Sequence, residues 1–233
     1  MKQFSSLSVF FPAYNEEPNI EKTVKDAIRV LEKVVLKYEV IIIDDGSKDK
    51  TGEIADKLAS ENNDIRVIHH NPNKGYGEAL KSGFYNAKYD WIAFTDSDGQ
   101  FDFSELPKLL EKTDEADLVV GYRLNRNDPI VRKVNGWLWT RLNNLLLGIN
   151  VRDVDCAFKL IKKEVIDSIP RLQSTRGGMI SPELLAKAHK KGFKIIEVGV
   201  HHYPRRLGEQ TGANLKVIIK SFVDLLGLWW KIK

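Results

Sequence analysis

Five short apolar runs, each continuous rather than alternating in polarity, constrain the fold of this chain more than any other feature. They are "LSVFFPAYNEE", "YEVIIIDDGS", "IRVIHHNPN", "WIAFTDSDG" and "DLVVGYR". Strands covered by helices on both faces have this appearance, whereas strands with one wet face alternate. Segments with apolar residues at helical spacing separate the runs, over residues 18–37, 49–62, 75–88 and 103–113. The alternation predicts an α/β fold with a doubly wound, mostly parallel sheet.

The second half of the chain is less regular. We expect a helix over residues 129–147, a strand in "DVDCAFKLI", a helix over 182–191, and one strand or two in "FKIIEVGVHHYP". These segments predict a single domain over residues 1–214, followed by an amphipathic helix over 215–233.

Composition limits the partners and the compartment. The chain has 36 Lys+Arg against 32 Asp+Glu, a formal charge of +4. This mild excess suits anionic small molecules or lipid headgroups, and no nucleic-acid partner is expected. Cys156 is the only cysteine, so no intramolecular disulfide can form, and the start at Met1 lacks a charged-then-apolar leader. We therefore expect a cytoplasmic protein, with no run near the ~18 apolar residues of a membrane span.

Polar residues gather where four of the predicted strands end. Because ligands of doubly wound sheets bind outside the carboxyl ends of the strands, these loops form a candidate site. In "WIAFTDSDGQF", a buried strand ends in Asp96 and Asp98, and Gln100 follows. Hard oxygen ligands suit Mg2+ or Mn2+, which bind proteins through one or two carboxylates together with substrate phosphates. The acid pair therefore predicts a metal that holds a diphosphate. Alternatively, such residues only turn the chain.

Four motifs in order, "FPAYNEE", "IIIDDGSKDKT", "NKGYGEAL" and "FTDSDGQFD", resemble the nucleotide-sugar half of the family-2 glycosyltransferases with the GT-A fold. Downstream, "GYR", "DVDCAFKLIKKEV" and "YPRRLGEQTGAN" are similar to the dolichyl- or polyprenyl-phosphate sugar synthases of that family. The resemblance implies a nucleotide-sugar half over residues 1–100 and an acceptor half over 101–214.

The resemblance also implies roles for the residues of these loops. The metal-side ligands would be Asp98 and Gln100, with Asp96 at the ribose or the metal. The nucleotide-sugar group would comprise Pro12, Tyr14 and Glu16 near the base, Asp44 and Asp45 at the base and ribose, and Lys74. A local alternative for Asp45 is that it begins an Asx-turn and caps the helix after it.

Three arginines, Arg123, Arg132 and Arg205, match arginines that surround the donor and acceptor phosphates in the family. The planar fork of arginine binds phosphate oxygens in pairs, which suits this role. One departure concerns the acceptor: this chain has Gly136 where the polyprenyl-phosphate synthases often carry a serine one turn after the equivalent of Arg132.

A second acid pair, Asp153 and Asp155, precedes "CAFKLI". In the family an acid here lies near the acceptor, which would give Asp155 a functional role. It could equally pair with Arg152 or Lys159. The five histidines lack zinc-type spacing and are expected to be structural.

These observations predict a metal-dependent, inverting glycosyltransferase that moves a hexose from a nucleotide-diphospho-sugar, of the GDP-mannose or UDP-glucose type, to a polyprenyl or dolichyl phosphate. A phosphate acceptor needs no general base, because a monoester with a second pKa near ~6 is already largely dianionic at neutral pH. The predicted catalytic residues are Asp98, Arg123, Arg132, Asp155 and Arg205.

Three alternatives stay open. One is a glycosyltransferase that uses a sugar hydroxyl of a growing glycan, with an aspartate of the second half as base. A sugar-phosphate nucleotidyltransferase should have a glycine-rich, arginine-containing first loop, and "FPAYNEE" has no glycine. A non-catalytic phospho-acceptor receiver domain also places acids after strands, but leaves the second half unexplained.

The segment over 215–233 is mostly apolar with one polar stripe. Lys220 and Asp224 interrupt it, so it cannot span a bilayer but can lie along the surface. Trp229 and Trp230 are of the residue type that favours the headgroup boundary. We expect it to bind an anionic membrane surface or a membrane-embedded partner on the cytoplasmic face. The alternative is that it packs on the domain or on a second subunit.

Overall fold

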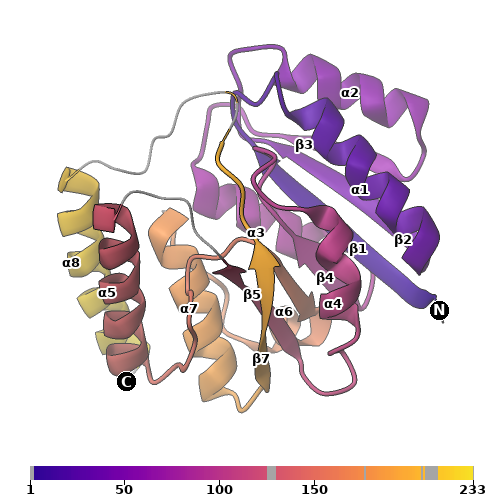
Figure 1. The fold of residues 1–233 in the computed structure, drawn as a ribbon. Coiled ribbons are helices and arrows are strands. Elements are labelled where there is room, and N and C mark those ends of the chain that lie inside the picture. The colour runs from indigo at the N-terminus through magenta and orange to yellow at the C-terminus, as the bar shows by residue number, and fades with distance from the viewer. Residues whose placement is uncertain (1–2, 125–129, 176, 206, 208–214, 233) are drawn as a thin grey trace.

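The computed structural model describes residues 3–124, 130–175, 177–205, 207 and 215–232. It has one seven-stranded sheet with helices on both faces (Figure 1). The strand order is β3-β2-β1-β4-β6-β5-β7, and β6 alone among them runs antiparallel to its neighbours β4 and β5. The predicted doubly wound, mostly parallel α/β sheet is therefore confirmed.

The first half alternates strand and helix as predicted. Its elements are β1 (Phe4–Ala13), α1 (Ile20–Val34), β2 (Val35–Asp44), α2 (Thr51–Glu61), β3 (Ile65–His69), α3 (Tyr76–Asn86) and β4 (Trp91–Phe94). One boundary was wrong: the helix predicted to reach Lys37 ends at Val34. The reason is that Val35 already pairs with Phe4, at the start of the longest parallel ladder of the sheet.

The second half contains the elements η1 (Phe103–Glu105), α4 (Leu106–Leu110), β5 (Leu118–Leu124), α5 (Ile130–Leu147), β6 (Lys159–Lys162), α6 (Lys163–Ser168), α7 (Gly177–Lys190), β7 (Ile195–His201) and α8 (Leu215–Ile232). Two predictions need correction. In "DVDCAFKLI" only the last residues form a strand. Helix α7 begins before Pro182, which lies inside the helix instead of starting it.

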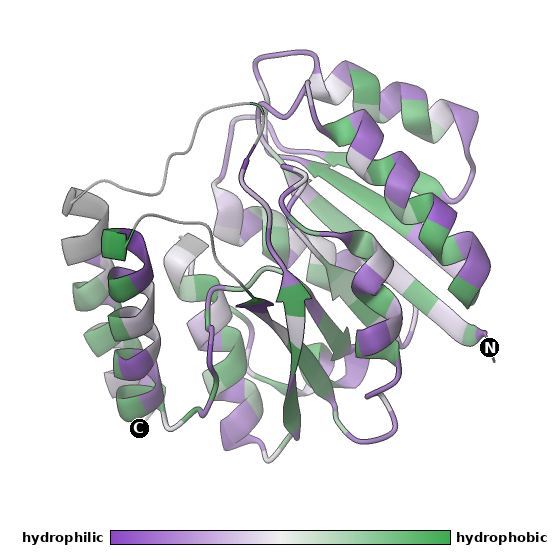
Figure 2. Cartoon of the chain, viewed as in Figure 1, coloured by the Kyte–Doolittle hydropathy of each residue, from purple (hydrophilic) through white to green (hydrophobic). Residues whose placement is uncertain are grey.

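The sheet separates two apolar layers, which explains why the strand runs are continuous. On β1, Phe10 packs on the side of α3, α6, α7 and α8, while Phe11 packs on the side of α1, α2 and α4. Figure 2 shows the strands mostly hydrophobic between helices of mixed character. Helix α3 lies so close to β1 that a Cβ atom at Gly83 would overlap the ring of Phe10.

Helix α8 lies beside α5 and α7 (Figure 1). Leu225 and Leu228 are buried in the core, and the ring of Phe222 meets Trp139 of α5 at a centroid distance of 5.6 Å. One side of α8 is therefore packed on protein. Another side exposes Val223, Leu226 and Trp230. No helix in the described part of the chain is both long and apolar enough to cross a bilayer.

Candidate functional site

Loops after β1, β2, β3 and β4 surround a cleft of about 700 Å³ at the carboxyl edge of the parallel strands, here named the large cleft. It brings together all four loops predicted from the sequence, and Arg205 from the segment after β7 joins them. The lining residues are Pro12, Ala13, Tyr14, Asn15, Glu16, Asp45, Asn73, Gly75, Tyr76, Ala79, Asp96, Ser97, Asp98 and Arg205.

Hydrogen bonds hold the first loop against the second loop and the start of α2. The backbone N–H of Glu16 donates to Oγ1 of Thr51 at 2.8 Å, and Asn15 N–H donates to Oγ of Ser47 at 3.0 Å. Asn15 adopts a positive φ of 54°, a region that asparagine tolerates better than most residues. These contacts keep Tyr14 at the rim of the cleft, where its side chain is 43% exposed.

Asp45 shapes the third loop from the floor of the cleft. Its Oδ1 lies 2.6 Å from Nδ1 of His70 and accepts the N–H of Lys74, while its Oδ2 accepts the N–H of Gly75 at 2.8 Å. The local turn that leads into α2 is formed instead by Asp49, whose carboxylate accepts the N–H of Thr51 at 3.0 Å. The local turn-and-cap alternative for Asp45 is therefore wrong, because its carboxylate serves a loop about thirty residues away.

Two predicted nucleotide residues lie outside the lining of the large cleft. The carboxylate of Asp44 meets Nδ1 of His69 at 2.8 Å and accepts the N–H of Ser47 at 3.0 Å. The side chain of Lys74 is exposed, and its backbone N–H is the group that reaches Asp45. Asp44 thus holds the loop after β2, and Lys74 belongs to the loop after β3. Of the three residues, Asp45 alone lines the large cleft.

The acid pair predicted at the end of β4 lies inside the cleft. Asp96 accepts a hydrogen bond from the hydroxyl of Tyr76 at 2.6 Å, and Asp98 accepts the N–H of Gln100 at 3.0 Å. Burial raises the pKa of Asp98 to about 6, and the neighbouring charge of Asp96 adds to the rise. Burial also raises the pKa of Asp96. Two partly buried carboxylates of this kind are stabilised as anions by a cation.

The donor set fits a metal that is shared with a substrate. Within the described residues, no three side chains of Asp, Glu, His or Cys are gathered into a complete protein-only metal site. Mg2+ typically takes one or two carboxylates and completes its shell with phosphate oxygens and water. Gln100 donates its amide N–H to the carbonyl of Tyr203 at 2.9 Å, so its side-chain oxygen is the group left for a metal.

Arg205 neutralises acids from two different loops. Its Nη2 lies 2.7 Å from Oε1 of Glu16, and its Nη1 lies 3.7 Å from Oδ2 of Asp98. Burial raises the pKa of Glu16, and the contacts with Asn19 and Arg205 oppose that rise. Arg205, predicted to lie near the donor and acceptor phosphates, therefore lies beside Asp98 of the acid pair.

A second cavity of about 180 Å³, here named the small cavity, adjoins the large cleft through Asp96. It gathers the predicted acceptor-side residues, although they are far apart in the sequence. Its lining comprises Asp96, Gln100, Phe101, Arg123, Arg132, Asp155, Ala157 and His202. Asp96 therefore lines both the large cleft and a small cavity that contains two arginines.

The two members of the second acid pair have different environments. Asp153 forms a paired contact with Arg123, at 2.6 Å to Nε and 2.7 Å to Nη2. Asp155 accepts the indole N–H of Trp139 at 3.3 Å. Surrounding protein atoms raise the pKa of Asp155 to about 6, and Asp153 adds to the rise, although the side chain still reaches solvent. The guanidinium of Arg123, predicted to bind phosphate, thus pairs with Asp153. Asp155 is the member of this acid pair that lines the small cavity, together with Asp96.

Sequence reasoning missed Tyr76 and the position of Lys159. The Lys159 side chain is fully buried behind the site, where its Nζ donates to the carbonyls of Cys156 and Val154 and to the hydroxyl of Ser181 at 3.2 Å. Burial lowers its pKa, and the nearby acids oppose this. A lysine inside the apolar run "CAFKLI" was the signal that could have identified it.

Comparison with known proteins identifies the group of enzymes that shares these features. The family model "Glycosyl transferase family 2" matches residues 8–169. "Glycosyltransferase AglD" of Haloferax volcanii is 31% identical over an alignment that covers 97% of this chain. The same alignment covers 37% of the length of that protein. "Dolichyl-phosphate beta-glucosyltransferase ALG5D" of Trichomonas vaginalis is 28% identical over 94% of this chain and 72% of its own. An "Undecaprenyl-phosphate 4-deoxy-4-formamido-L-arabinose transferase" of Photorhabdus laumondii is 29% identical over 97% of this chain and 68% of its own.

Solved structures share the fold. Glucosyl-3-phosphoglycerate synthase from Mycobacterium tuberculosis, in complex with Mn2+, UDP and glucosyl-3-phosphoglycerate, has a TM-score of 0.71 and 25% identity, covering 95% of this chain and 80% of that one. The same enzyme with Mg2+ and UDP has a TM-score of 0.70 and 23% identity, covering 95% and 79%.

Proposed function

The chain belongs to glycosyl transferase family 2, and from that premise we propose that it transfers a hexose from a nucleotide-diphospho-sugar to a polyprenyl or dolichyl phosphate. The resemblance carried by the four sequence motifs is thereby confirmed at the level of the family. One observation carries the finer proposal: Asp96 lines both the large cleft and the arginine-containing small cavity. A donor in the cleft and a phosphate in the cavity would meet beside it.

The large cleft is proposed as the donor site. Its volume of about 700 Å³ lies within the range of small-molecule and cofactor sites. Pro12 and Tyr14 at the rim would contact the base, with Asp45 deeper in the cleft. Asp98, with Asp96 and the side-chain oxygen of Gln100, would hold Mg2+ or Mn2+. When bound, such an ion offsets the negative charge of the leaving diphosphate.

Arg205 would assist departure of the nucleotide diphosphate. Its guanidinium already lies 3.7 Å from Asp98, so a diphosphate bound at the acid pair would be within reach of the same cation. Charge-assisted contacts from arginine to phosphate oxygens stabilise the charge that develops as the sugar–oxygen bond breaks.

The small cavity is proposed as the acceptor-phosphate site. Arg132 lines it beside Asp155, and two of the relatives are named for transfer to dolichyl or undecaprenyl phosphate. An acceptor phosphate oxygen would attack the anomeric carbon, forming the new sugar–oxygen bond with inversion while the bond to the diphosphate breaks. No proton need be removed from a dianionic phosphate.

A second acceptor class has support from one observation. Asp155 lines the small cavity with a pKa of about 6, which suits a general base near neutral pH. A sugar hydroxyl could then replace the lipid phosphate as nucleophile. Mass spectrometry of products from UDP-glucose or GDP-mannose, offered undecaprenyl phosphate or an oligosaccharide with and without Mn2+, separates the two. A glycosylated lipid phosphate is expected, and a glycosylated oligosaccharide alone would overturn the lipid assignment.

Donor choice can be measured independently of the acceptor. Ligands that bind the native state raise its melting temperature, so a thermal-shift screen of nucleoside diphosphates with and without Mn2+ reports the base and the metal together. We expect stabilisation by one diphosphate that depends on the metal. Absence of any nucleotide effect would remove the donor assignment of the large cleft.

Peripheral attachment to a membrane, on its cytoplasmic face, is proposed from the outer surface of α5 and α8. Exposed apolar patches of this kind mark interaction surfaces, and a lipid acceptor requires the enzyme to reach a bilayer. The outward apolar residues are Ile130, Val131, Val134, Trp137, Leu138, Phe222, Val223, Leu226 and Trp230. Sedimentation with liposomes tests the attachment, and full-length protein that ignores anionic liposomes would contradict it.

A further inference from the structure

Tyr76, the first residue of α3, meets Asp96 inside the large cleft, and both residues line it. The hydroxyl oxygen of Tyr76 lies 2.6 Å from Oδ1 of Asp96. A phenol with a pKa near ~10 is protonated at neutral pH, so the tyrosine is the donor and the carboxylate is the acceptor. Tyr76 is not among the site residues predicted from the sequence, although the acid that it contacts lines both the large cleft and the small cavity.

The two carboxylate oxygens of Asp96 have different surroundings. Among the described residues, the hydroxyl of Tyr76 is the only hydrogen-bond donor to this carboxylate, and it binds Oδ1. Oδ2 accepts no such bond and keeps contact with solvent, since the buried side-chain atoms that lack a partner in the described chain are Oγ1 of Thr95 and Oδ1 of Asn143. The terminal torsion of an aspartate is soft, so the hydrogen bond to Tyr76 decides which oxygen faces a ligand.

Two glycines place the backbone of Tyr76. Gly75 has a φ of 92°, in the region that favours glycine, and its N–H donates to Oδ2 of Asp45 at 2.8 Å. The N–H of Gly77 donates to the carbonyl of Thr175 at 3.0 Å. A Cβ atom at Gly77 would lie 2.5 Å from the carbonyl carbon of Thr175, so this close approach requires glycine. Hydrogen bonds on both sides therefore fix the backbone that carries Tyr76.

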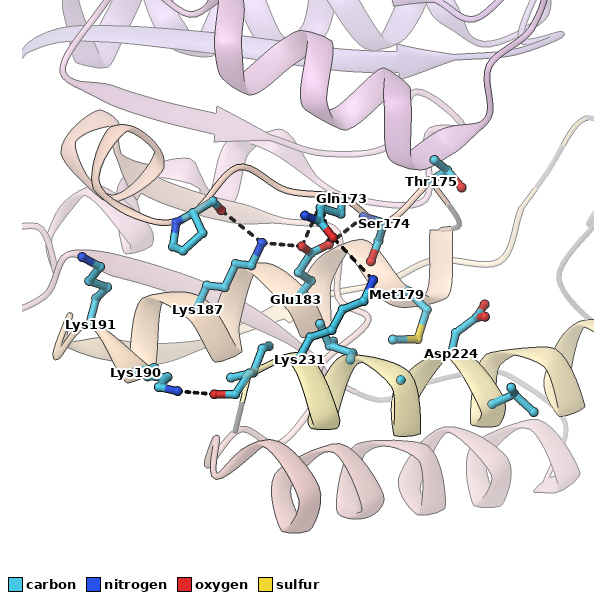
Figure 3. A pocket seen from close by; sticks show the side chains of 15 residues that line it. Gln173, Ser174, Thr175, Met179, Glu183, Lys187, Lys190, Lys191, Asp224 and Lys231 are labelled. Carbon is cyan, nitrogen blue, oxygen red and sulfur yellow. Dashed lines mark hydrogen bonds and ion pairs between the residues drawn. The ribbon is translucent and has the colours of Figure 1, made fainter.

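The segment before α7, which accepts the N–H from α3, is itself anchored. Glu183, whose side chain is 2% exposed, accepts the N–H groups of Gln173 and Ser174 at 2.9 and 2.7 Å. Figure 3 shows this carboxylate between the segment and Lys187, in the wall of a cavity of about 990 Å³ between α7 and α8. A buried ion pair thus supports the start of α3, and the fold sets the position of Tyr76.

We propose that Tyr76 is a positioning residue, which holds Asp96 so that Oδ2 alone is presented to the metal of the donor site. The inference rests on the proposed function and deepens it, because it names the group that orients one of the proposed metal ligands. Carboxylates that bind metals are themselves oriented by hydrogen bonds from neighbouring groups. Loss of such a partner typically lowers metal affinity or activity about 10- to 100-fold.

Tyr76→Phe removes the hydroxyl and keeps the ring, which packs against the apolar core. UDP and GDP are each titrated by calorimetry into the full chain, once with Mn2+ and once with EDTA. For the diphosphate that binds, the gain in affinity brought by Mn2+ should fall about 10- to 100-fold in Tyr76→Phe, while the affinity in EDTA stays within about twofold of wild type. An equal loss with and without Mn2+, or no loss at all, would overturn the positioning role.

Tyr85→Phe, on the same helix, is the matched control. The hydroxyl of Tyr85 accepts the N–H of Leu172 at 2.8 Å, and Tyr85 is not one of the described residues that line the large cleft or the small cavity. This variant also loses one hydrogen bond made by α3, so it should lower the melting temperature yet leave the effect of Mn2+ within about twofold. A fall as large as that in Tyr76→Phe would show that any disturbance of α3 has this result, and would overturn the inference.

A crystal structure of the wild type with Mn2+ and the diphosphate that binds tests the same point without a substitution. Oδ1 of Asp96 should remain at hydrogen-bond distance from the hydroxyl of Tyr76, while Oδ2 contacts the metal. A carboxylate that binds the metal through both oxygens, or that has turned away from Tyr76, would overturn the inference. This measurement decides the question even if Tyr76→Phe fails to fold.

Transfer to undecaprenyl phosphate in detergent is measured separately, so that the inference and the proposed function can fail independently. A wild type that binds neither diphosphate in the presence of Mn2+ would overturn the donor assignment of the large cleft and this inference with it. Metal-dependent binding that is unchanged in Tyr76→Phe would overturn the inference alone. Metal-dependent binding that needs the hydroxyl of Tyr76, without transfer to the lipid phosphate, would defeat the acceptor proposal alone.

Discussion

Nη2 of Arg205 lies 2.7 Å from Oε1 of Glu16, although 189 residues separate the two in the sequence. This ion pair joins the segment after β7 to the loop after β1. The same guanidinium approaches Asp98 of the acid pair. The large cleft is therefore completed by both halves of the chain, and a variant in either half can affect a donor bound there.

Asp98→Asn should lower turnover by at least about 100-fold and remove Mn2+-dependent nucleotide binding, because an amide cannot supply the charge that the metal requires. The fold should persist, since the side chain packs at a loop. Steady-state kinetics and thermal shifts with a nucleoside diphosphate measure both effects. Asp102→Asn, just after the same loop, is the control, because asparagine can still accept the N–H of Ser104. Near wild-type turnover of Asp98→Asn with Mn2+ would refute the metal role.

Arg132→Ala should raise the acceptor KM or lower turnover, while donor affinity stays nearly unchanged. Loss of a charge-assisted contact should cost about 1.5–3 kcal/mol, roughly a 10- to 150-fold drop in kcat/KM for the acceptor. Lys133→Ala, an exposed cation one residue along α5, is the matched control. Calorimetry that finds much weaker donor binding in Arg132→Ala would move this arginine to the donor side.

Lys159→Met should lower the free energy of unfolding by roughly 3 kcal/mol, since breaking a buried charged network leaves other groups uncompensated. The hydroxyl of Ser181 and the carbonyls of Val154 and Cys156 would all lose their donor. Lys162→Met, in the same strand but partly exposed, should change stability by less than about 1 kcal/mol. Urea unfolding measures the free energy of unfolding of both variants. Equal losses would mean that burial does not make Lys159 more important for stability than Lys162.

Glu39 predicts a pH dependence of stability. Burial opposes its ionisation, but hydrogen bonds from Ser8, the N–H of Lys88 and Arg66 outweigh burial and lower its pKa. Because the folded pKa lies below the unfolded value of 4.5, this stabilisation is present above pH 4.5 and is lost as pH falls through the folded pKa. The stability difference between wild type and Glu39→Gln should therefore shrink from neutral pH to about pH 3. A constant difference would contradict it.

Much of the fold could be predicted from patterns within single segments of the sequence. The run around Phe10 and Phe11 is continuous because neighbouring residues of a strand point to opposite faces, and both faces are buried. Asp96 and Asp98 follow the apolar run of β4 directly in the sequence, so their position at the end of this strand could also be predicted from one segment. Boundaries such as Val34 were less certain, because helical spacing continues into residues that β1 recruits into the sheet.

The sequence by itself determined the α/β class, the edge of the sheet where polar groups gather, and the family. Only the tertiary structure decided which groups meet: Asp153 with Arg123, Asp45 with the loop before α3, and part of the apolar side of α8 with the core. The physical reason is the separation in sequence between the residues that interact. A repeat of two or 3.6 residues is visible within one segment, whereas the choice of an ion-pair partner depends on distances between segments that the chain brings together on folding.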